Sequence, residues 1–291
     1  MVLGAAGQDG RYLVEHHRRR GDRVLAFSRS AGEDRTCLDV ADRTAVAALI
    51  GAERPSVVYQ LAAVSSTRDE ALWDNQAAIG AGTLNVLEAA WSRSRETRVV
   101  VIGSALQFQN RGEPIGETDP FEASSGYALA RISATYAARY FRARGLRAYV
   151  AYLFHHESPL REPPHVSARI CRDVAAISRG EAQVLEIGDP SVEKEWGYAG
   201  DVVEGLMTLA SQDRVFEAVV GTGRAYSISD WIERCFSFVG LSSTDRVRET
   251  PGFRAEYRRI VSRPDTLMGL GWSPTVDIDD LAARMMRAAL K

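Results

Sequence analysis

The sequence predicts an α/β protein, in which a doubly wound parallel sheet is followed by a smaller carboxyl-terminal lobe. Three observations lead to this fold class. Short apolar runs alternate strictly with longer amphipathic segments through the first half of the chain, which is typical of strands and crossover helices. Glycines recur every three residues at the first strand-to-helix junction. Prolines at 159, 163 and 164 then interrupt the alternation, and the pattern is looser beyond them.

The elements of the first half follow this alternation in order. Buried strands are expected at 24–27, 56–63, 99–104 and 147–154, where short runs are rich in apolar and β-branched residues. Helices are expected between them at 9–20, 42–51, 70–93 and 126–144. Only residues 1–3 precede the first glycine, although strands are typically about five residues long. Either this central strand is short or the protein starts upstream.

The second half is expected to form the smaller lobe. Helices are predicted near 165–179, 199–211, 227–239 and 277–290, joined by short strands such as residues 215–220. We therefore divide the chain into a first domain of residues 1–157, with a return segment near 188–211, and a lobe of residues 158–187 and 212–291. This lobe would close over the carboxyl edge of the sheet and bind the substrate there.

Composition and charge exclude several classes of protein. A chain of 291 residues with 45% hydrophobic residues can bury a substantial core, and its net charge of −2 favours neither nucleic acid nor an anionic membrane as partner. No apolar run reaches the roughly 20 residues that cross a bilayer, so we expect a cytoplasmic protein. Cys37, Cys171 and Cys235 are far apart, which suits reduced thiols, and no Cys/His spacing predicts a metal.

The spacing of Gly4, Gly7 and Gly10 indicates a Rossmann-type dinucleotide-binding turn. Glycines permit a tight bend and a close approach of the backbone to a pyrophosphate, whose charge the following helix N-terminus stabilises. A plain strand-to-helix turn would also explain the glycines, but their place at the start of the alternation favours the cofactor site. We therefore expect an NAD- or NADP-binding domain.

The end of the second strand discriminates between the two cofactors. An acidic residue there would bind an adenosine ribose, whereas Ser28 and Arg29 offer donors and a positive charge that suit a 2′-phosphate. NADP is therefore favoured over NAD. The alternative is that Arg29 is only a solvated loop residue.

Motifs along essentially the whole chain resemble one branch of the extended short-chain dehydrogenases/reductases. This branch contains the GDP-mannose 4,6-dehydratases and the 4-keto-6-deoxy-mannose reductases. The resemblance rests on "GQDG" (7–10), "YQLAAVSS" (59–66), "LFHHESP" (153–159), "GDPSVEKEWGYAGDVVEG" (188–205), "GTGRAYSISDWIE" (221–233) and "LGWSP" (270–274). It implies an NADP-dependent enzyme that acts on a nucleotide-diphosphate sugar, and a GDP-linked sugar is the expected substrate.

The resemblance also assigns catalytic roles. Tyr127 would take a proton from the sugar C4 hydroxyl, and Ser104 would share that hydrogen bond. The cation four residues after the tyrosine is Arg131, where the family carries a lysine that holds the nicotinamide ribose and lowers the pKa of the phenol. Because Lys194 and Lys291 are the chain's two lysines, general replacement of lysine by arginine would explain Arg131. Such a replacement explains how Arg131 arose, but the planar guanidinium differs in shape from the ammonium that the family's site holds.

A second departure concerns the elimination step. By the same resemblance, dehydration needs a carboxylate two residues after Ser104, and that position is Leu106. Gln107 is adjacent, but an amide is not a base. We therefore expect oxidation, reduction or epimerisation at C4 to be favoured over full dehydration. The alternative is a catalytically impaired homologue that binds nucleotide or nucleotide sugar as a regulatory or scaffolding subunit.

Further site residues are implied by the resemblance alone. The cofactor-binding residues are Gly4, Gly7, Gln8, Asp9, Gly10, Ser28, Arg29, Asp39, Val40, Leu61, Ala62, Ala63, Tyr127, Arg131, His156 and Arg161. The substrate-binding residues are Ser65, His155, Val166, Arg169, Gly188, Lys194, Arg254 and Glu256. His155 replaces an asparagine of the family, and Lys194 replaces an arginine. The apolar stripes of the helices at 70–93 and 126–144 predict a homodimer or homotetramer, although core packing would explain them equally well.

Overall fold

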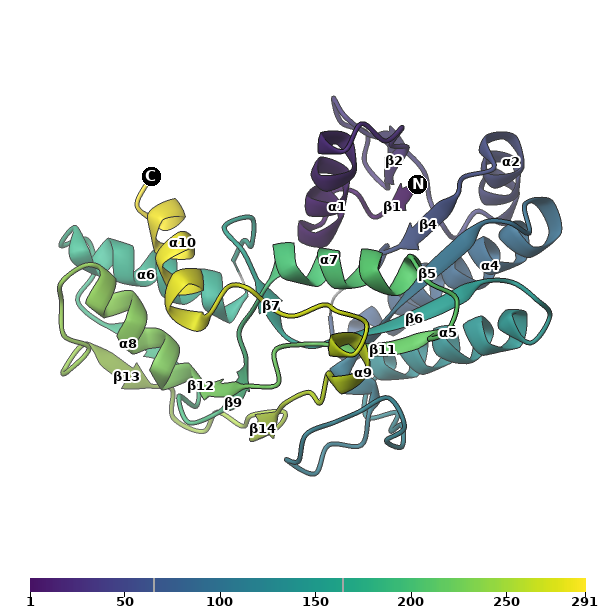
Figure 1. The fold of residues 1–291 in the computed structure, drawn as a ribbon. Helices are drawn as coiled ribbons and strands as arrows, with labels where there is room; N and C mark the ends of the chain where they lie inside the picture. Colours follow the sequence, from purple (N-terminus) through teal and green to yellow (C-terminus); the bar gives the residue numbers. More distant parts are fainter. Residues whose placement is uncertain (65, 164) are drawn as a thin grey trace.

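A seven-stranded parallel sheet lies at the centre of the computed structural model, which describes residues 1–64, 66–163 and 165–291. The strand order is β11-β6-β5-β4-β1-β2-β3, and helices cover both faces of the sheet (Figure 1). The predicted α/β class and doubly wound sheet are thus confirmed. The strands are β1 (Val2–Leu3), β2 (Ala26–Ser28), β3 (Thr36–Cys37), β4 (Val57–Gln60), β5 (Arg98–Ser104), β6 (Ala148–Leu153) and β11 (Glu217–Val220).

Alternating side chains along the strands build two cores. In β5, Val99 and Val101 pack into one core, whereas Val100 and Ile102 pack into the other, because successive side chains of a strand point to opposite faces. Helices α2 (Arg43–Glu53), α4 (Gly82–Arg93) and α5 (Gly126–Arg142) cover the first face. Helices α1 (Gln8–Arg19) and α7 (Ala199–Ala210) cover the second.

The segment predicted as one helix at 70–93 is a composite. A short 3₁₀ turn leads into α3 (Leu72–Asn75), a wider π-helical turn follows at Gln76–Ala81, and α4 completes the segment. The other helices predicted for the first half start and end within two residues of α1, α2 and α5. Periodicity therefore located the helices, but it did not reveal the wide turn.

One strand lies in a different place from the one predicted. Residues 215–220 were expected in the second lobe, but β11 within this run is the edge strand of the central sheet and pairs in parallel with β6. The predicted placement is therefore wrong. The physical reason is that Val219 packs into one core while Ala218 and Val220 pack into the other, which requires a sheet covered on both faces.

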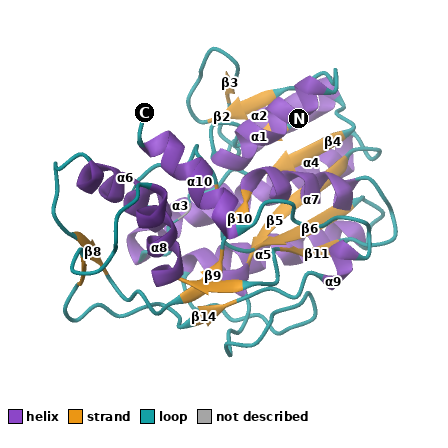
Figure 2. Cartoon of the chain, turned by 60° about the vertical axis from the view of Figure 1, so that its left-hand side comes forward, coloured by secondary structure: helices purple, strands orange, loops and turns teal. Residues whose placement is uncertain are grey.

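The second lobe has its own core around a pair of stacked indoles. The rings of Trp196 and Trp231 are parallel, with centroids 4.4 Å apart, and both side chains are buried. Figure 2 shows the lobe helices α6, α8 and α10 grouped beside the sheet. The lobe and its connections contain β7 (His156–Glu157), α6 (Val166–Ser178), β8 (Leu185–Ile187), β9 (Glu193–Glu195), β10 (Gly197–Tyr198), β12 (Ala225–Ser227), α8 (Ile228–Phe238), β13 (Val247–Glu249), β14 (Arg259–Ile260), α9 (Asp265–Met268) and α10 (Ile278–Ala289).

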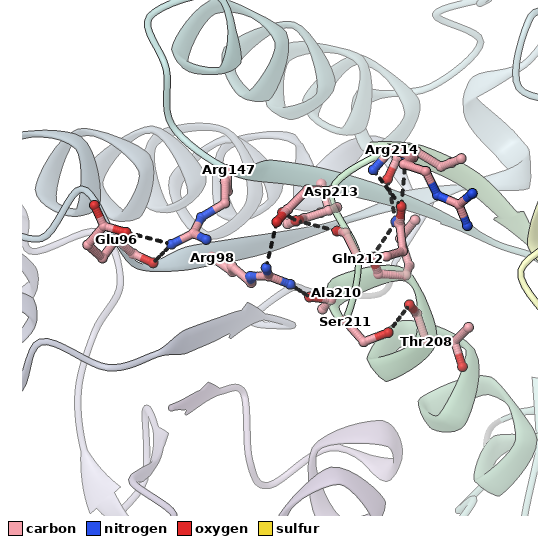
Figure 3. Close-up of polar contacts among 12 residues, drawn as sticks. Glu96, Arg98, Arg147, Thr208, Ala210, Ser211, Gln212, Asp213 and Arg214 are labelled. Atoms are coloured by element: carbon pink, nitrogen blue, oxygen red, sulfur yellow. Dashed lines mark hydrogen bonds and ion pairs between the residues drawn. The ribbon is translucent and has the colours of Figure 1, made fainter.

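Polar contacts at the amino ends of β5 and β6 anchor the end of α7 (Figure 3). Arg98 donates to the carbonyl oxygen of Ala210 and pairs with Asp213 at 2.8 Å. Arg147 pairs with Glu96 at 3.0 Å. These contacts tie the amino ends of β5 and β6 to neighbouring loops, whereas ligands of such sheets bind at the carboxyl edge.

The structure also bears on the expectations about membranes and metals. No helix in the described ranges is long and apolar enough to span a bilayer. Within residues 1–64, 66–163 and 165–291, no cluster of three or more His, Cys, Asp or Glu side chains is arranged to hold a metal ion. The three cysteines are free thiols, and those of Cys171 and Cys235 lie 3.7 Å apart in the core of the lobe.

Candidate active site

A cleft of about 500 Å³ opens at the carboxyl edge of the sheet, above β1, β2 and β4. Its walls come from the glycine turn, the ends of β2 and β4, and the loop before α2. Most of the predicted cofactor-binding residues line it, namely Gly4, Gly7, Gln8, Asp9, Gly10, Ser28, Arg29, Asp39, Val40, Leu61, Ala62, Ala63 and Arg161. Tyr127, Arg131 and His156 lie outside its lining.

The backbone of the glycine turn fits a dinucleotide. Gly4 has a φ of +94°, and a side chain there would lie 2.8 Å from the backbone nitrogen of Ala62. A side chain at Gly10 would lie 2.7 Å from the Cα of Ala5, so α1 packs closely on the strand before it. Gly7 caps α1 without a side-chain oxygen, which leaves the first-turn N–H groups to an anion. The turn therefore suits a pyrophosphate.

A second arginine, which was not predicted from the sequence, contacts the cleft wall at its adenosine end and also lies 3.4 Å from the carboxylate of Asp34. The Nε of Arg35 donates to the Oγ of Ser28 at 3.1 Å, and Ser28 in turn donates to the carbonyl oxygen of Ser30 at 2.5 Å. Arg29 is exposed at the same end. A bridge between Gly32 and Arg35 folds the loop back, which brings Arg35 to Ser28. The sequence signal that could have identified this contact is the presence of a second basic residue, Arg35, in the loop after Arg29.

The segment that follows β6 is hydrogen-bonded to the glycine turn. His156 bonds through Nε2 to the Oδ1 of Asp9 at 2.9 Å and through Nδ1 to the carbonyl oxygen of Phe154 at 2.7 Å. Burial lowers the pKa of His156, but the Asp9 carboxylate outweighs burial and raises it. Ser158 donates to the Oε1 of Gln8 at 2.7 Å. His156 thus acts on the cofactor turn through Asp9, since both ring nitrogens are engaged.

Glu157 is the buried hub of a charged cluster that was not singled out from the sequence, although it lies within the quoted "LFHHESP". Its carboxylate accepts from the Nε of Arg161 at 2.8 Å and lies 2.9 Å from the Nε2 of His155. The Nδ1 of His155 donates to the carbonyl oxygen of Glu195 at 2.7 Å. Burial raises the pKa of Glu157, but His155 and Arg161 outweigh burial and lower it.

Lys194 extends this cluster toward the lobe. Its side chain is buried, and the ammonium lies 5.0 Å from the centroid of the Trp196 ring. Burial lowers the pKa of Lys194 to about 8, an effect that Glu157 partly offsets. The cluster therefore joins the predicted substrate residues His155 and Lys194 to the predicted cofactor residue Arg161.

The predicted catalytic residues lie on two elements that pack against each other. Ser104 ends β5, and Tyr127 and Arg131 lie on successive turns of α5, which contacts both β5 and the 105–107 turn. Ser125 caps α5 by accepting from the N–H of Ala128 at 3.1 Å. The Oγ of Ser104 accepts from the N–H of Leu106 at 3.2 Å. Its proton remains available as a donor.

Arg131 is turned into the protein. One terminal nitrogen donates to the carbonyl oxygen of Ile102 at 2.7 Å, and the guanidinium carbon lies 5.0 Å from the Tyr127 ring centroid. The side chain is 5% exposed, and its Nε has no acceptor within the described part of the chain. An unsatisfied buried donor costs about 1–3 kcal/mol, and because Arg131 does not line the cleft, a bound ligand could supply the missing acceptor only if the side chain moved.

A second cavity of about 570 Å³ lies beside the strand end. Leu106 lines it together with two carboxylates, Glu122 and Glu256, and with Ser124. Burial raises the pKa of Glu256. The predicted substrate residue Glu256 is thus brought to the same cavity as the apolar side chain of Leu106.

The remaining predicted substrate residues are dispersed in the lobe. Val166 and Arg169 lie on α6, and Arg169 donates to the carbonyl oxygen of Glu186 at 2.8 Å. Gly188 packs under the exposed ring of Phe253, where a side chain would lie 2.6 Å from a ring carbon. Arg254 is exposed in the same segment as Phe253. None of these lines either cavity, and Ser65 lies outside the described residues.

Comparisons with known proteins agree with this geometry. A family model described as GDP-mannose 4,6 dehydratase matches residues 1–285. A GDP-mannose 4,6-dehydratase of Sinorhizobium fredii (strain HH103) is 30% identical, over 100% of this chain and 96% of that protein. The structure of RMD from Pseudomonas aeruginosa complexed with NADPH superimposes with a TM-score of 0.82 at 22% identity, covering 99% of this chain and 96% of that chain.

The UDP-glucose 4-epimerase of Thermus thermophilus, solved in complex with NAD, superimposes with a TM-score of 0.84 at 21% identity, covering 99% of this chain and 97% of that chain. The fold and the glycine cleft define a Rossmann-type α/β protein with a dinucleotide-binding turn. Within this class, the chain belongs to the GDP-mannose 4,6 dehydratase family, as the family model that spans nearly all of it shows.

Proposed function

We propose that this protein is an NADP-dependent enzyme that oxidises, reduces or epimerises a GDP-linked sugar at C4. The observation that carries the proposal is the placement of Ser104 and Tyr127 on packed elements, with the apolar Leu106 at the position where the family resemblance leads us to expect a carboxylate. A bound nicotinamide would supply hydride transfer to or from C4. The family supports a nucleotide sugar as substrate, and the names of its curated relatives favour the GDP-linked form.

The protein's own groups would handle the C4 proton. Tyr127 would accept the proton of the C4 hydroxyl, and Ser104, whose Oγ already accepts from Leu106, would donate to the same oxygen. The guanidinium carbon of Arg131 lies 5.0 Å from the centroid of the Tyr127 ring, so its positive charge stands beside the group that would take the proton. Leu106 offers neither proton acceptor nor donor, so elimination between C5 and C6 would lack its usual base.

The preference for NADP rests on three side chains at the adenosine end. Arg29 and Arg35 supply positive charge, and Ser28, whose hydroxyl already donates to Ser30, accepts from Arg35 and holds it in place. Charge-assisted hydrogen bonds from guanidinium groups suit a 2′-phosphate, whereas an acidic residue would suit the free hydroxyl of NAD. The solved structures of this fold include complexes with either cofactor, so the preference depends on these residues.

A homodimer is supported by the outer face of α4 and α5. Leu84, Leu129, Tyr136 and Tyr140 are each between 47% and 57% exposed, which is unusual for side chains of this size. The residues on α5 are spaced by seven and four positions, so they form one stripe along the helix. Pairing with the same face of a second copy would cover the stripe.

The test is to incubate purified protein with NADP⁺ or NADPH and a panel of GDP-linked and UDP-linked sugars. Nicotinamide absorbance would report C4 redox, and mass spectrometry of the products would report epimerisation or loss of water. The proposal expects redox or epimer products from a GDP-linked sugar. Efficient loss of water from GDP-mannose would contradict the argument from Leu106.

The buried placement of Arg131 favours a second candidate function. A guanidinium committed to the carbonyl of Ile102 is less free to hold a nicotinamide ribose than a lysine would be. The alternative is therefore an impaired homologue that binds nucleotide or nucleotide sugar as a regulatory or scaffolding subunit. Tight binding of NADPH without turnover of any sugar in the panel would select this alternative.

A further inference from the structure

Gln107 is fully buried and connects the two elements that carry the candidate catalytic residues. Its Oε1 accepts from the backbone N–H of Ser104 at 2.9 Å, and its Nε2 donates to the Oγ1 of Thr135 at 3.0 Å. The hydroxyl of Thr135 donates in turn to the carbonyl oxygen of Arg131 at 3.0 Å. A continuous chain of hydrogen bonds therefore runs from the end of β5 to α5.

The direction of every bond in this chain is determined by its two ends. The backbone N–H of Ser104 is only a donor, so the amide oxygen of Gln107 must face it. The carbonyl of Arg131 is only an acceptor, so Thr135 gives it a proton and must accept from the amide nitrogen. One amide orientation satisfies both ends, and the opposite orientation would place two donors face to face at Ser104.

This series of hydrogen bonds holds the backbone of the candidate catalytic residue Ser104. Gln107 and Ser104 form a reciprocal capping box around the 105–107 turn, in which the Ser104 hydroxyl accepts from Leu106. The amide is also packed against the strand, since a side chain on Gly103 would lie 2.8 Å from its Oε1. Rotation of the Ser104 backbone would therefore break the box and leave buried polar groups unsatisfied.

We propose that Gln107 is a positioning residue, which through Thr135 holds the Ser104 hydroxyl in register with the turns of α5 that carry Tyr127 and Arg131. The inference rests on the proposed function, because the register matters for turnover only if Ser104 and Tyr127 act on one sugar hydroxyl. The inference gives the amide of Gln107 a positioning role in turnover. Gln107 is adjacent to Leu106, and its amide cannot act as the base that elimination would need.

The first test compares Gln107→Leu and Thr135→Val, which remove the hydrogen bonds at similar volume, with Thr135→Ser, which keeps the hydroxyl. The control is Thr97→Val, because Thr97 is equally buried and donates to the carbonyl of Pro55 at 2.6 Å at the amino edge. We expect Gln107→Leu to lower kcat by about 10- to 100-fold with little change in KM. A loss no larger than that of the control would overturn the inference.

The second test separates positioning from general stability. Gln107→Leu is combined with Ser104→Ala, and kcat is measured in each single and double variant at matched folded fraction. If Gln107 acts through Ser104, adding Gln107→Leu to the Ser104→Ala variant changes kcat by less than about twofold, because the hydroxyl that Gln107 positions is already absent. Fully additive losses would mean that Gln107 affects turnover by another route, and the inference would be wrong.

The third test does not depend on turnover. Amide hydrogen exchange of residues 104–106 is measured in Gln107→Leu and Thr135→Val, and is expected to be at least about tenfold faster than in Thr97→Val. Unchanged exchange at this turn would overturn the inference. If the unaltered protein converts no nucleotide sugar but exchange accelerates as expected, the proposed function fails while the role of Gln107 in holding Ser104 stands.

Discussion

The guanidinium carbon of Arg131 lies 5.0 Å from the ring centroid of Tyr127, and the same guanidinium donates to the carbonyl of Ile102 at 2.7 Å. The cation four residues after the tyrosine is therefore present but packed inside the fold. Its Nε is buried without an acceptor in the described residues, and Arg131 lines neither cavity, so contact with a bound ribose would require the side chain to move.

The first prediction concerns this cation. Arg131→Met should lower kcat on the order of 100-fold, because the positive charge beside Tyr127 is lost, whereas Arg131→Lys should stay within about threefold of the unaltered protein. Steady-state kinetics with NADP and the nucleotide sugar that the panel assay selects give both values. A large gain in Arg131→Lys would instead indicate a site in which arginine has impaired catalysis.

The second prediction restores a carboxylate. Leu106→Glu places an acid/base in the cavity beside the strand end, so formation of a 4-keto-6-deoxy product should rise at least about tenfold. Leu106→Gln is the matched control, since it has the same size without a proton acceptor of that kind. Mass spectrometry detects the loss of water, and equal yields from the two variants would contradict the assigned role of this position.

The third prediction concerns cofactor choice. Arg35→Gln should weaken NADPH binding about 10- to 100-fold and NADH binding little, because a charge-assisted hydrogen bond to a 2′-phosphate contributes about 1.5–3 kcal/mol. Arg20→Gln, an exposed substitution remote from the cleft, is the control. Fluorescence titration with both cofactors measures the dissociation constants. Equal losses for NADH and NADPH would argue against a phosphate contact.

The fourth prediction concerns acid stability. Burial raises the pKa of Glu217, but hydrogen bonds from Arg139, Tyr152 and Arg142 outweigh burial and lower it to about 2, from a reference of 4.5. A lowered folded pKa stabilises the protein above pH 4.5 and loses that contribution as the pH falls toward 2. Glu217→Gln should therefore destabilise the protein at pH 7, on the order of 3 kcal/mol.

The same substitution should also flatten the dependence of unfolding free energy on pH between 4.5 and 2. Denaturant unfolding at several pH values measures it, with Glu15→Gln as a control, since Glu15 pairs on the surface with Arg19. If Glu217→Gln retains the slope of the unaltered protein, the hydrogen bonds around this carboxylate do not lower its pKa.

The fifth prediction concerns assembly. Leu129→Glu combined with Tyr136→Glu should convert a dimer to a monomer, because two charges would be buried at the stripe on α5. Phe238→Glu is the control, since this side chain is 37% exposed on α8 in the other lobe. Sedimentation velocity reports the change, and a protein that is monomeric without substitution would remove the case for the dimer.

The sequence alone determined the local elements and the cofactor end. Strict alternation located the helices and strands of the first half, since periodicity reflects which face each side chain buries. The glycine turn also follows from local spacing, because a turn needs only neighbouring residues, whereas the roles of Ser104 and Tyr127 were assigned by the family resemblance. These features were predictable without knowing which strands pair.

Tertiary structure alone decided the contacts between distant segments. It placed β11 in the central sheet, engaged both ring nitrogens of His156 and brought Arg35 to Ser28. It also turned Gln107 toward Thr135, which lies 28 residues away. The physical reason is that a buried polar group takes its partners from whatever packing brings within about 3 Å, and sequence spacing does not encode that proximity.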